Sequence, residues 1–187
     1  MYDKYKISKL LYELNINKGD TLVIHSDAMA LAQFNEIGQK IDYNNFFKNI
    51  LDYLGSNGTL ALPTFTYSAT SNQTYYPLKS KSKVGVISNK FLNFDGVKRT
   101  NHPIFSFGVI GKNEDELLNL EDYTCFGQNS IFTKLYELSS KIICLGCSTK
   151  NSITFMHHME EKALVPYRKY IFFDGVISEN KKSYKVK

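Results

Sequence analysis

The sequence predicts an α/β fold with a mixed, largely parallel sheet flanked by helices and an antiparallel extension. Short apolar runs bounded by turn residues, typical of buried strands, alternate with segments whose apolar residues recur at helical spacing. Strands that alternate with helices are joined by crossovers, which makes neighbouring strands parallel. Near the C-terminus, two strand patterns follow each other directly around the turn residues 179–181. That hairpin predicts the antiparallel extension.

The elements can be assigned in chain order from these patterns. The first third of the chain is expected to hold four of them, each ended by turn residues or by Pro63: a helix over 7–14, a strand at Thr21–Ile24, a helix over 41–54 and a strand at Thr59–Leu62. After a polar loop from Ser68 to Lys81, the following are expected: a helix starting near Val84, a strand at Ser106–Ile110, helices at Glu114–Leu120 and Ile131–Leu138, a strand at Lys141–Leu145, a helix around His157, and strands at Tyr170–Phe173, Gly175–Ser178 and Ser183–Val186.

Length and charge limit the classes of function. With 187 residues and no linker, residues 1–187 are predicted to form a single domain. No apolar run approaches the roughly 20 residues that span a bilayer, and the polar N-terminus does not resemble a signal peptide. We therefore expect a cytoplasmic protein. The net charge of +5 is modest and the lysines are scattered, which argues against nucleic-acid binding.

The three cysteines are odd in number and are predicted to be structural. Cys144 and Cys147 have C-x-x-C spacing, but no second pair completes a zinc tetrad. The adjacent His157 and His158 cannot chelate one metal ion from one helix face. No metal site is expected.

The segment Thr154–Glu161 places two histidines beside two carboxylates. In a helix, His157 and Glu160 lie three residues apart on one face, and His158 and Glu161 repeat that relation on the neighbouring face. An imidazole oriented by a carboxylate can act as a general base, because the ordinary pKa of histidine, roughly 6.5, lies near working pH. The alternative is a surface helix with His–Glu pairs and no chemistry.

Polar residues also follow the predicted strands, at the sheet edge where ligands gather in open α/β folds. His25 and Ser26 follow the first strand, and Pro63–Thr66 follow the second. Ser82 is predicted to cap the next helix, where Gly85 would let a phosphate approach the backbone. The alternative for Ser82 is an ordinary capped helix.

A loop at Arg99–Pro103 adds a further histidine. Pro103 keeps His102 out of the helical region and fixes its direction. Ser106 starts the next predicted strand. This histidine either serves the site or hydrogen-bonds the backbone. A serine hydrolase is disfavoured, because no G-x-S-x-G motif is present.

Taken in order, these motifs resemble the aminoglycoside 3-N-acetyltransferase family of antibiotic N-acetyltransferases, which is distinct from the GCN5-related acetyltransferases. The resemblance extends from Ser8 to Phe173 and rests on seven segments: Lys18–Ser26, Gly58–Thr66, Ser82–Gly85, Arg99–Pro103 with Ser106–Phe107, Phe126–Ser130, Leu145–Gly146 and Thr154–Glu160. Each motif alone is weak, whereas seven in the family's order form a strong signal.

The resemblance implies transfer of an acetyl group from acetyl-CoA, as co-substrate, to a primary amine of an amino sugar. The family pattern T-x-x-H-x-x-E makes His157 the general base and Glu160 its orienting partner. It also implies a set of cofactor-binding residues: His25, Ser26, Thr64, Phe65, Ser82, Val84, Gly85, His102 and Ser106.

The chain departs from the family in two ways. It ends at Lys187, in the predicted hairpin, whereas relatives are longer, so either the protein is naturally short or it lacks a C-terminal segment that in relatives helps to wall the acceptor pocket. It is also basic, with a pI of about 8.9, although polycationic aminoglycosides favour acidic sites. The charge therefore favours a less cationic acceptor, such as an amino sugar on a nucleotide, lipid or surface-polysaccharide carrier, over the antibiotic itself. The alternative function is a truncated or impaired relative that binds CoA without turnover. The expected partner is a small-molecule amine, with neither nucleic acid nor membrane, and the prediction leaves room for a homodimer.

Overall fold

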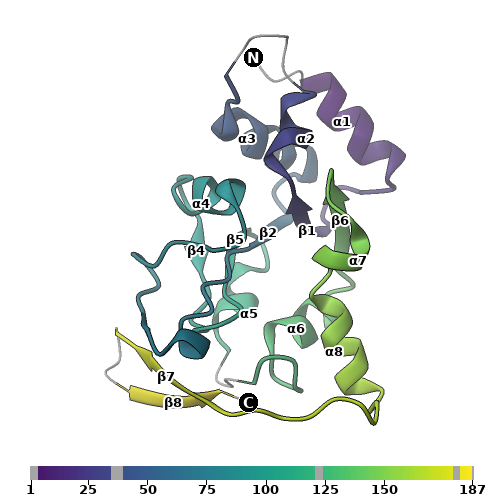
Figure 1. Ribbon diagram of the computed structural model, residues 1–187. Helices are drawn as coiled ribbons and strands as arrows, with labels where there is room; N and C mark the ends of the chain where they lie inside the picture. Colours follow the sequence, from purple (N-terminus) through teal and green to yellow (C-terminus); the bar gives the residue numbers. More distant parts are fainter. Residues whose placement is uncertain (1–3, 35–39, 121–123, 179–181, 187) are drawn as a thin grey trace.

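The computed structural model describes residues 4–34, 40–120, 124–178 and 182–186 (Figure 1). The elements run in the order α1 (Lys4–Glu13), β1 (Thr21–Ser26), α2 (Ala28–Ala32), α3 (Tyr43–Leu54), β2 (Thr59–Pro63), the 3-10 turn η1 (Ala69–Ser71), β3 (Thr74–Tyr75), α4 (Val86–Leu92), β4 (Lys98–Arg99), β5 (Phe107–Gly111), α5 (Glu114–Leu118), α6 (Ile131–Glu137), β6 (Lys141–Leu145), α7 (Thr149–Ser152), α8 (Phe155–Lys162), β7 (Phe173–Ile177) and β8 (Lys182–Val186).

The main sheet has the strand order β4-β5-β2-β1-β6. Strand β1 lies at the centre of the parallel part and pairs parallel with both β2 and β6. Strand β5 runs antiparallel to β2, and β4 runs antiparallel to β5. The predicted mixed α/β fold is confirmed. Because β1, β2 and β6 are parallel, their carboxyl ends meet at one edge, which brings His25 beside Cys144.

A smaller sheet has the order β3-β7-β8, with β7 and β8 antiparallel. In Figure 1 it lies at the foot of the molecule, below the main sheet. The predicted strand at Tyr170–Phe173 is wrong, because β7 begins only at Phe173. Tyr170, Ile171 and Phe172 lie outside the sheet and are about 60% exposed. The predicted hairpin turn at 179–181 falls outside the described residues.

Both faces of the main sheet are covered by helices, because successive side chains of a strand point to opposite faces. Leu22 and Ile24 of β1 pack into a cluster with apolar residues of α1, α3 and α4. Val23 points the other way and joins a cluster built on α5 and α6. Aromatic residues of the helices pack against those of the sheet. Phe132 of α6, for example, lies 5.6 Å from Phe107 of β5, measured between ring centroids. This rigid frame holds the strand ends that carry the predicted site residues.

The start of α4 differs from the prediction. Helix α4 begins at Val86, and Gly85 precedes it with φ +124° and without a side-chain cap. The Ser82 hydroxyl instead accepts a hydrogen bond from the Val84 N–H at 3.2 Å, in the turn before the helix. The prediction that Ser82 caps the helix is therefore wrong. The left-handed φ of Gly85 changes the direction of the chain after that turn. A serine before a predicted helix does not by itself indicate such a change.

Within the described ranges, no helix combines the length and the apolar character that crossing a membrane requires.

Candidate functional site

Helix α8 presents the predicted histidine–glutamate pair at the surface. His157 Nδ1 lies 3.1 Å from Glu160 Oε2, as the three-residue spacing on a helix predicts. The His157 side chain is 42% exposed and that of Glu160 is 25% exposed. The imidazole is therefore held by a carboxylate while part of it remains open to a ligand.

The neighbouring register serves a different purpose. His158 is 5% exposed, and its Nδ1 lies 2.7 Å from the backbone oxygen of Phe126. The Phe126 ring in turn packs edge-on against the His157 imidazole, 5.4 Å between centroids. His158 thus anchors the segment that supports His157. Of the two histidines, His157 is therefore the one that is accessible to solvent.

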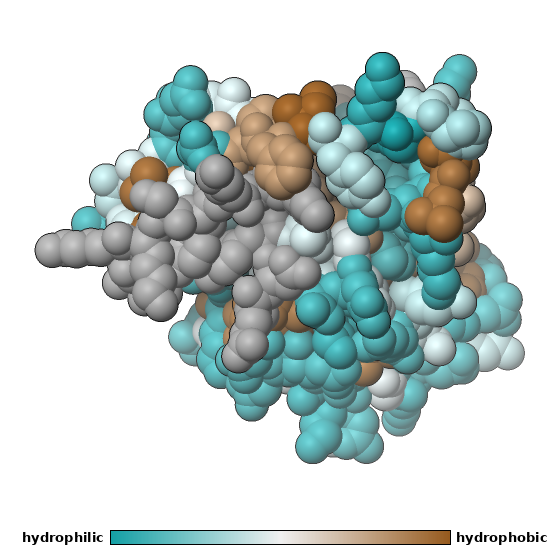
Figure 2. All heavy atoms as spheres, turned by 90° about the horizontal axis from the view of Figure 1, so that it is seen from below, coloured by the Kyte–Doolittle hydropathy of each residue, from teal (hydrophilic) through white to brown (hydrophobic). Residues whose placement is uncertain are grey.

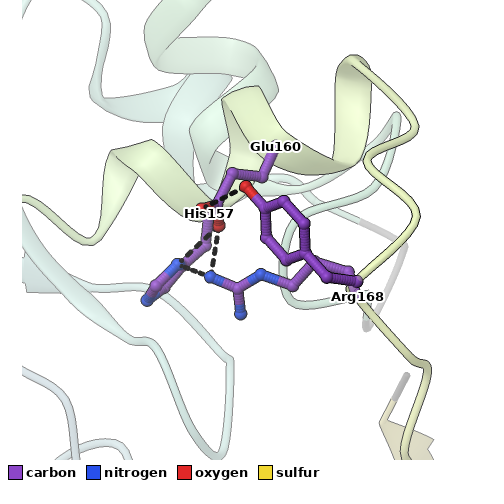
Figure 3. Close-up of polar contacts among 4 residues, drawn as sticks. His157, Glu160 and Arg168 are labelled. Carbon is purple, nitrogen blue, oxygen red and sulfur yellow. Dashed lines mark hydrogen bonds and ion pairs between the residues drawn. The ribbon is translucent and has the colours of Figure 1, made fainter.

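Two residues beyond the helix complete the cluster (Figure 3). Leu164, at φ +52°, turns the chain back after α8. The Arg168 guanidinium then contacts both His157 Nδ1 and Glu160 Oε2, and the Tyr167 hydroxyl donates to Glu160 Oε1 at 3.2 Å. The contact with His157 and, after it, those of Arg168 hold the pKa of the Glu160 carboxyl below its ordinary value. Glu160 therefore stays ionised beside the imidazole.

The cluster lines a cleft of about 580 Å³. Apolar and aromatic side chains form most of its wall: Tyr67, Ile104, Phe105, Phe126, Leu164, Val165, Ile171 and Phe173. Its charged residues are Glu160, Glu161, Arg168 and Lys169. Figure 2 shows the molecule from below, where hydrophobic residues reach the surface as separate patches among hydrophilic ones. We call this space the acceptor cleft.

A second cleft of about 200 Å³ lies at the carboxyl ends of β1 and β2, and we call it the strand-end cleft. Four residues of the predicted cofactor set line it, namely His25, Ser26, Phe65 and Val84. Burial lowers the pKa of His25 to about 4, so this imidazole is neutral at physiological pH. Tyr67 lines both clefts, so the two lie next to each other at this residue.

Other members of the predicted set lie outside both walls. Ser82 is 7% exposed and Thr64 is fully buried, while Gly85 stands before α4 with open space at its Cα. Ser106 is also fully buried. His102 is 9% exposed, and its Nδ1 accepts hydrogen bonds from the backbone N–H groups of Ile104 and Phe105. The structure uses His102 to shape its own loop.

Thr64 and Ser106 belong to a buried network around Arg99. The Ser106 hydroxyl donates to the Thr64 carbonyl at 2.8 Å, and the Thr64 hydroxyl donates to the Ser106 carbonyl at 3.1 Å. Arg99 Nε lies 3.2 Å from both hydroxyl oxygens, and the guanidinium also donates to the carbonyls of Pro77 and Ser80. These residues join β2, β4 and β5 from the inside.

Two of the three cysteines, Cys144 and Cys147, lie near the strand-end cleft, whereas Cys125 lines the acceptor cleft. Burial, with a smaller contribution from Cys147, raises the pKa of the Cys144 thiol to about 11. Cys147 itself lines the cleft. Among the described residues, no cluster of three His, Cys, Asp or Glu side chains could hold a metal ion.

The sequence profile of the aminoglycoside 3-N-acetyltransferase family matches residues 23–187. The chain belongs to this family. Family members are acyltransferases, which fits a histidine–carboxylate pair beside two adjoining clefts. Two curated relatives were found, each 25% identical to the chain. One is the SPbeta prophage-derived aminoglycoside N(3')-acetyltransferase-like protein YokD of Bacillus subtilis strain 168, where the match covers 90% of this chain and 67% of the relative. The other is aminoglycoside N(3)-acetyltransferase IV of a Salmonella species, with 84% and 58% covered. The chain thus spans about three fifths to two thirds of their lengths.

Solved structures of the family share the fold. YokD from Bacillus subtilis superposes with a TM-score of 0.81 at 24% identity, covering all of this chain and 82% of that one. A binary complex of AAC-IIIb with CoASH gives 0.79 at 18% identity, with 98% and 74% covered. AAC-VIa bound to sisomicin gives 0.81 at 17% identity, with 99% and 74% covered. At these identities the structures establish the shared aminoglycoside 3-N-acetyltransferase fold.

Sequence reasoning missed Arg168, Tyr167 and Tyr67. Arg168 follows α8 by six residues and returns only because Leu164 reverses the chain. Helical periodicity ends with the helix and cannot predict such a return. Tyr67 follows the Pro63–Thr66 motif directly, and that adjacency was the signal available for it.

Proposed function

We propose that this protein transfers the acetyl group of acetyl-CoA to a primary amine of an amino sugar, with His157 as the general base and Glu160 as its orienting partner. The observation that carries the proposal is the half-exposed His157–Glu160 pair in a cleft that meets a second cleft at Tyr67. A reaction between two substrates needs two adjoining sites with a base in reach of the attacking group, and His157 lines the cleft assigned to the amine.

The strand-end cleft is the site we assign to the thioester arm of acetyl-CoA. His25, Ser26, Phe65 and Val84 supply a partly apolar wall with two polar side chains. The neutral His25 can accept or donate a hydrogen bond without demanding a counter-charge. The complex of AAC-IIIb with CoASH supports a coenzyme A thioester as the donor. Thr64, Ser82, His102 and Ser106 support this cleft from within the fold.

The acceptor cleft is the site we assign to the amine. A protonated amine has no lone pair with which to attack a carbonyl, so a base must take a proton before or during the attack. In the proposed step the amine nitrogen bonds to the thioester carbonyl carbon and the carbon–sulfur bond breaks. His157 Nε2 takes the proton, while Glu160 holds Nδ1–H and stabilises the imidazolium. The sulfur leaves as the thiol of CoA after protonation.

For the acceptor, the relatives named above support aminoglycosides, as in the sisomicin complex of AAC-VIa. Among the described residues, the wall of the acceptor cleft is mostly apolar and contains two carboxylates. Amino sugars of lower positive charge, such as those linked to nucleotides or surface polysaccharides, fit that composition better than a polycation.

The test is release of CoA thiol from acetyl-CoA in the presence of aminoglycosides, free amino sugars and nucleotide-linked amino sugars. We expect release that depends on at least one acceptor, together with thermal stabilisation by CoA. Stabilisation by CoA without turnover on any amine would instead favour the impaired CoA-binding relative. Neither turnover nor stabilisation would contradict both assignments.

A further inference from the structure

His157 Nδ1 has two partners that require opposite states of the same atom. The Glu160 carboxylate only accepts hydrogen bonds, so it needs a proton on Nδ1. The Arg168 guanidinium only donates, so it needs the lone pair of Nδ1. A neutral imidazole cannot satisfy both, because one nitrogen cannot carry a proton and offer a lone pair together. Arg168 and Glu160 therefore compete for Nδ1.

The outcome of this competition decides whether His157 can act as a base. When Nδ1–H bonds Glu160, the lone pair lies on Nε2, and that nitrogen can accept a proton. When Arg168 donates to Nδ1, the proton lies on Nε2, which can then only donate. Figure 3 shows one guanidinium nitrogen in contact with both the imidazole and the carboxylate, while His157 and Glu160 also contact each other, so both partners of Nδ1 are present at once. Something must draw Arg168 away before the reaction.

The charges of the acceptor cleft indicate what does so. Among the described residues, its charged lining consists of two carboxylates, Glu160 and Glu161, and two cations, Arg168 and Lys169. The Arg168 side chain is 43% exposed, and Lys169 forms no ion pair within the described part of the chain. A guanidinium binds the paired oxygens of a phosphate or carboxylate in a planar fork. An amine that also carries an acidic group can be attracted by both the carboxylates and the cations of the cleft. A polycation, by contrast, would be repelled by Arg168 and Lys169.

We propose that Arg168 and Lys169 bind an acidic group, phosphate or carboxylate, on the acceptor amine, and that this binding moves Arg168 off His157 Nδ1 and so produces the base-competent tautomer. The proposal rests on the proposed function, since it names the acceptor class of that site. Arg168 acts through His157 and is a positioning residue as well as a substrate contact.

The first test reads the tautomer directly and needs no turnover. Nitrogen-15 NMR of the ring, assigned with a His157→Gln spectrum, is recorded at a pH where the imidazole is neutral. In the free protein we expect the proton on Nε2, and on addition of glucosamine 6-phosphate a shift of the proton to Nδ1. In Arg168→Gln we expect Nδ1 to be protonated from the start. A proton on Nδ1 in the free wild-type protein, or no response to the phosphate, would overturn the proposal.

The second test compares acceptors that differ only in charge. Thiol release is measured with glucosamine, glucosamine 6-phosphate and 2-amino-2-deoxyglucuronic acid, so that phosphate and carboxylate are separated. We expect kcat/KM for at least one acidic acceptor to exceed that for glucosamine by about tenfold or more. Arg168→Gln should remove this preference while raising kcat for glucosamine. Equal losses on all three acceptors would mean a merely structural role and would contradict the proposal.

Two further variants keep this test interpretable. Arg168→Lys retains the charge and should retain part of the preference. Lys112→Gln removes an equal charge from an exposed residue after β5, outside both clefts, and should change nothing. If no amine is acetylated while the NMR shifts occur as expected, the proposed function fails and the anion-dependent tautomer stands. If an amine is acetylated but the NMR signals do not shift, the proposed function stands and the anion-dependent tautomer is wrong.

Discussion

Two arginines of this protein show how the same side chain serves architecture in one place and chemistry in another. Arg99 is half-buried, and its described partners are neutral: two hydroxyls, the Tyr75 ring, and the backbone carbonyls of Thr64, Pro77 and Ser80. Arg168 is half exposed and contacts an imidazole and a carboxylate at the edge of a cleft. The first set of partners is fixed by the fold. The second can be exchanged for a ligand.

The contrast between the two arginines applies to the other motif residues as well: some motif residues only hold the fold together, whereas others are accessible to a ligand. Thr64, Ser106 and His102 belong to family motifs just as His157 does. Their polar atoms, however, form hydrogen bonds with other groups of the protein. His157 keeps part of its ring at the surface of the acceptor cleft. Substitutions near Arg99 should therefore change stability first, and substitutions near Arg168 should change turnover first.

The largest effect is expected at the base. His157→Gln should lower kcat by about 10²- to 10⁴-fold, the usual contribution of a general base, with little change in melting temperature. His158→Gln is the matched control, and it should mainly lower stability, because it breaks the contact with the Phe126 carbonyl. If His158→Gln abolishes turnover while His157→Gln retains it, the assigned register is wrong.

Next in size is the loss of Arg99. Arg99→Gln removes a guanidinium that bonds five atoms across three segments, so the free energy of unfolding should fall by about 3 kcal/mol. Urea unfolding measures it. Arg168→Gln provides the comparison and should lower stability by less than about 1 kcal/mol, because its ion pair is partly exposed. Equal losses for the two variants would remove the distinction drawn between the two arginines.

A smaller effect should follow from trimming the hydroxyls inside the network. Ser106→Ala leaves the Thr64 carbonyl with one donor fewer and should lower stability by about 1 to 2 kcal/mol, while KM for acetyl-CoA stays unchanged. A KM for acetyl-CoA that rises severalfold without loss of stability would show instead that Ser106 touches the cofactor. That result would restore the role implied by the family motif.

The smallest effect at neutral pH concerns His25. Burial lowers its folded-state pKa to about 4, whereas the unfolded chain has the ordinary value of 6.5. Between these values the unfolded chain binds a proton that the folded protein does not. Stability should therefore be fully present above pH 6.5 and should decline as the pH falls towards 4. His25→Gln should flatten that decline in urea-unfolding curves recorded across this range. An unchanged slope would place the acid sensitivity elsewhere.

The sequence predicts the frame of this fold well, because burial imposes strong patterns. Thr21–Ile24 and Thr59–Leu62 are short apolar runs, and both lie in central strands. The two-residue strands β3 and β4 are too short for any period to develop, so they were missed. The short helices α2 and α7 were not predicted, because they too are too short to show a periodic pattern. Element ends depend on single backbone turns, such as the one at Gly85.

The candidate site divides along a similar line. The His157–Glu160 contact is local, three residues apart on one helix, and the structure has it as predicted. The Arg168 contact depends on a chain reversal at Leu164, and the place of Tyr67 between the two clefts depends on its contacts with Ile104 and Phe105 of the loop between β4 and β5. Contacts of this kind are tertiary, and no spacing in the sequence encodes them.

The shared side chain of Tyr67 links the two ligand sites thermodynamically. Because one ring belongs to both walls, a ligand that displaces it in the strand-end cleft also reshapes the acceptor cleft. Such a coupling is reciprocal: the factor by which the thioester changes the affinity for the amine equals the factor by which the amine changes the affinity for the thioester. The Tyr67 backbone, at φ +54°, has a conformation that few tyrosines adopt, so the residue that both ligands would contact is held in an uncommon turn of the chain.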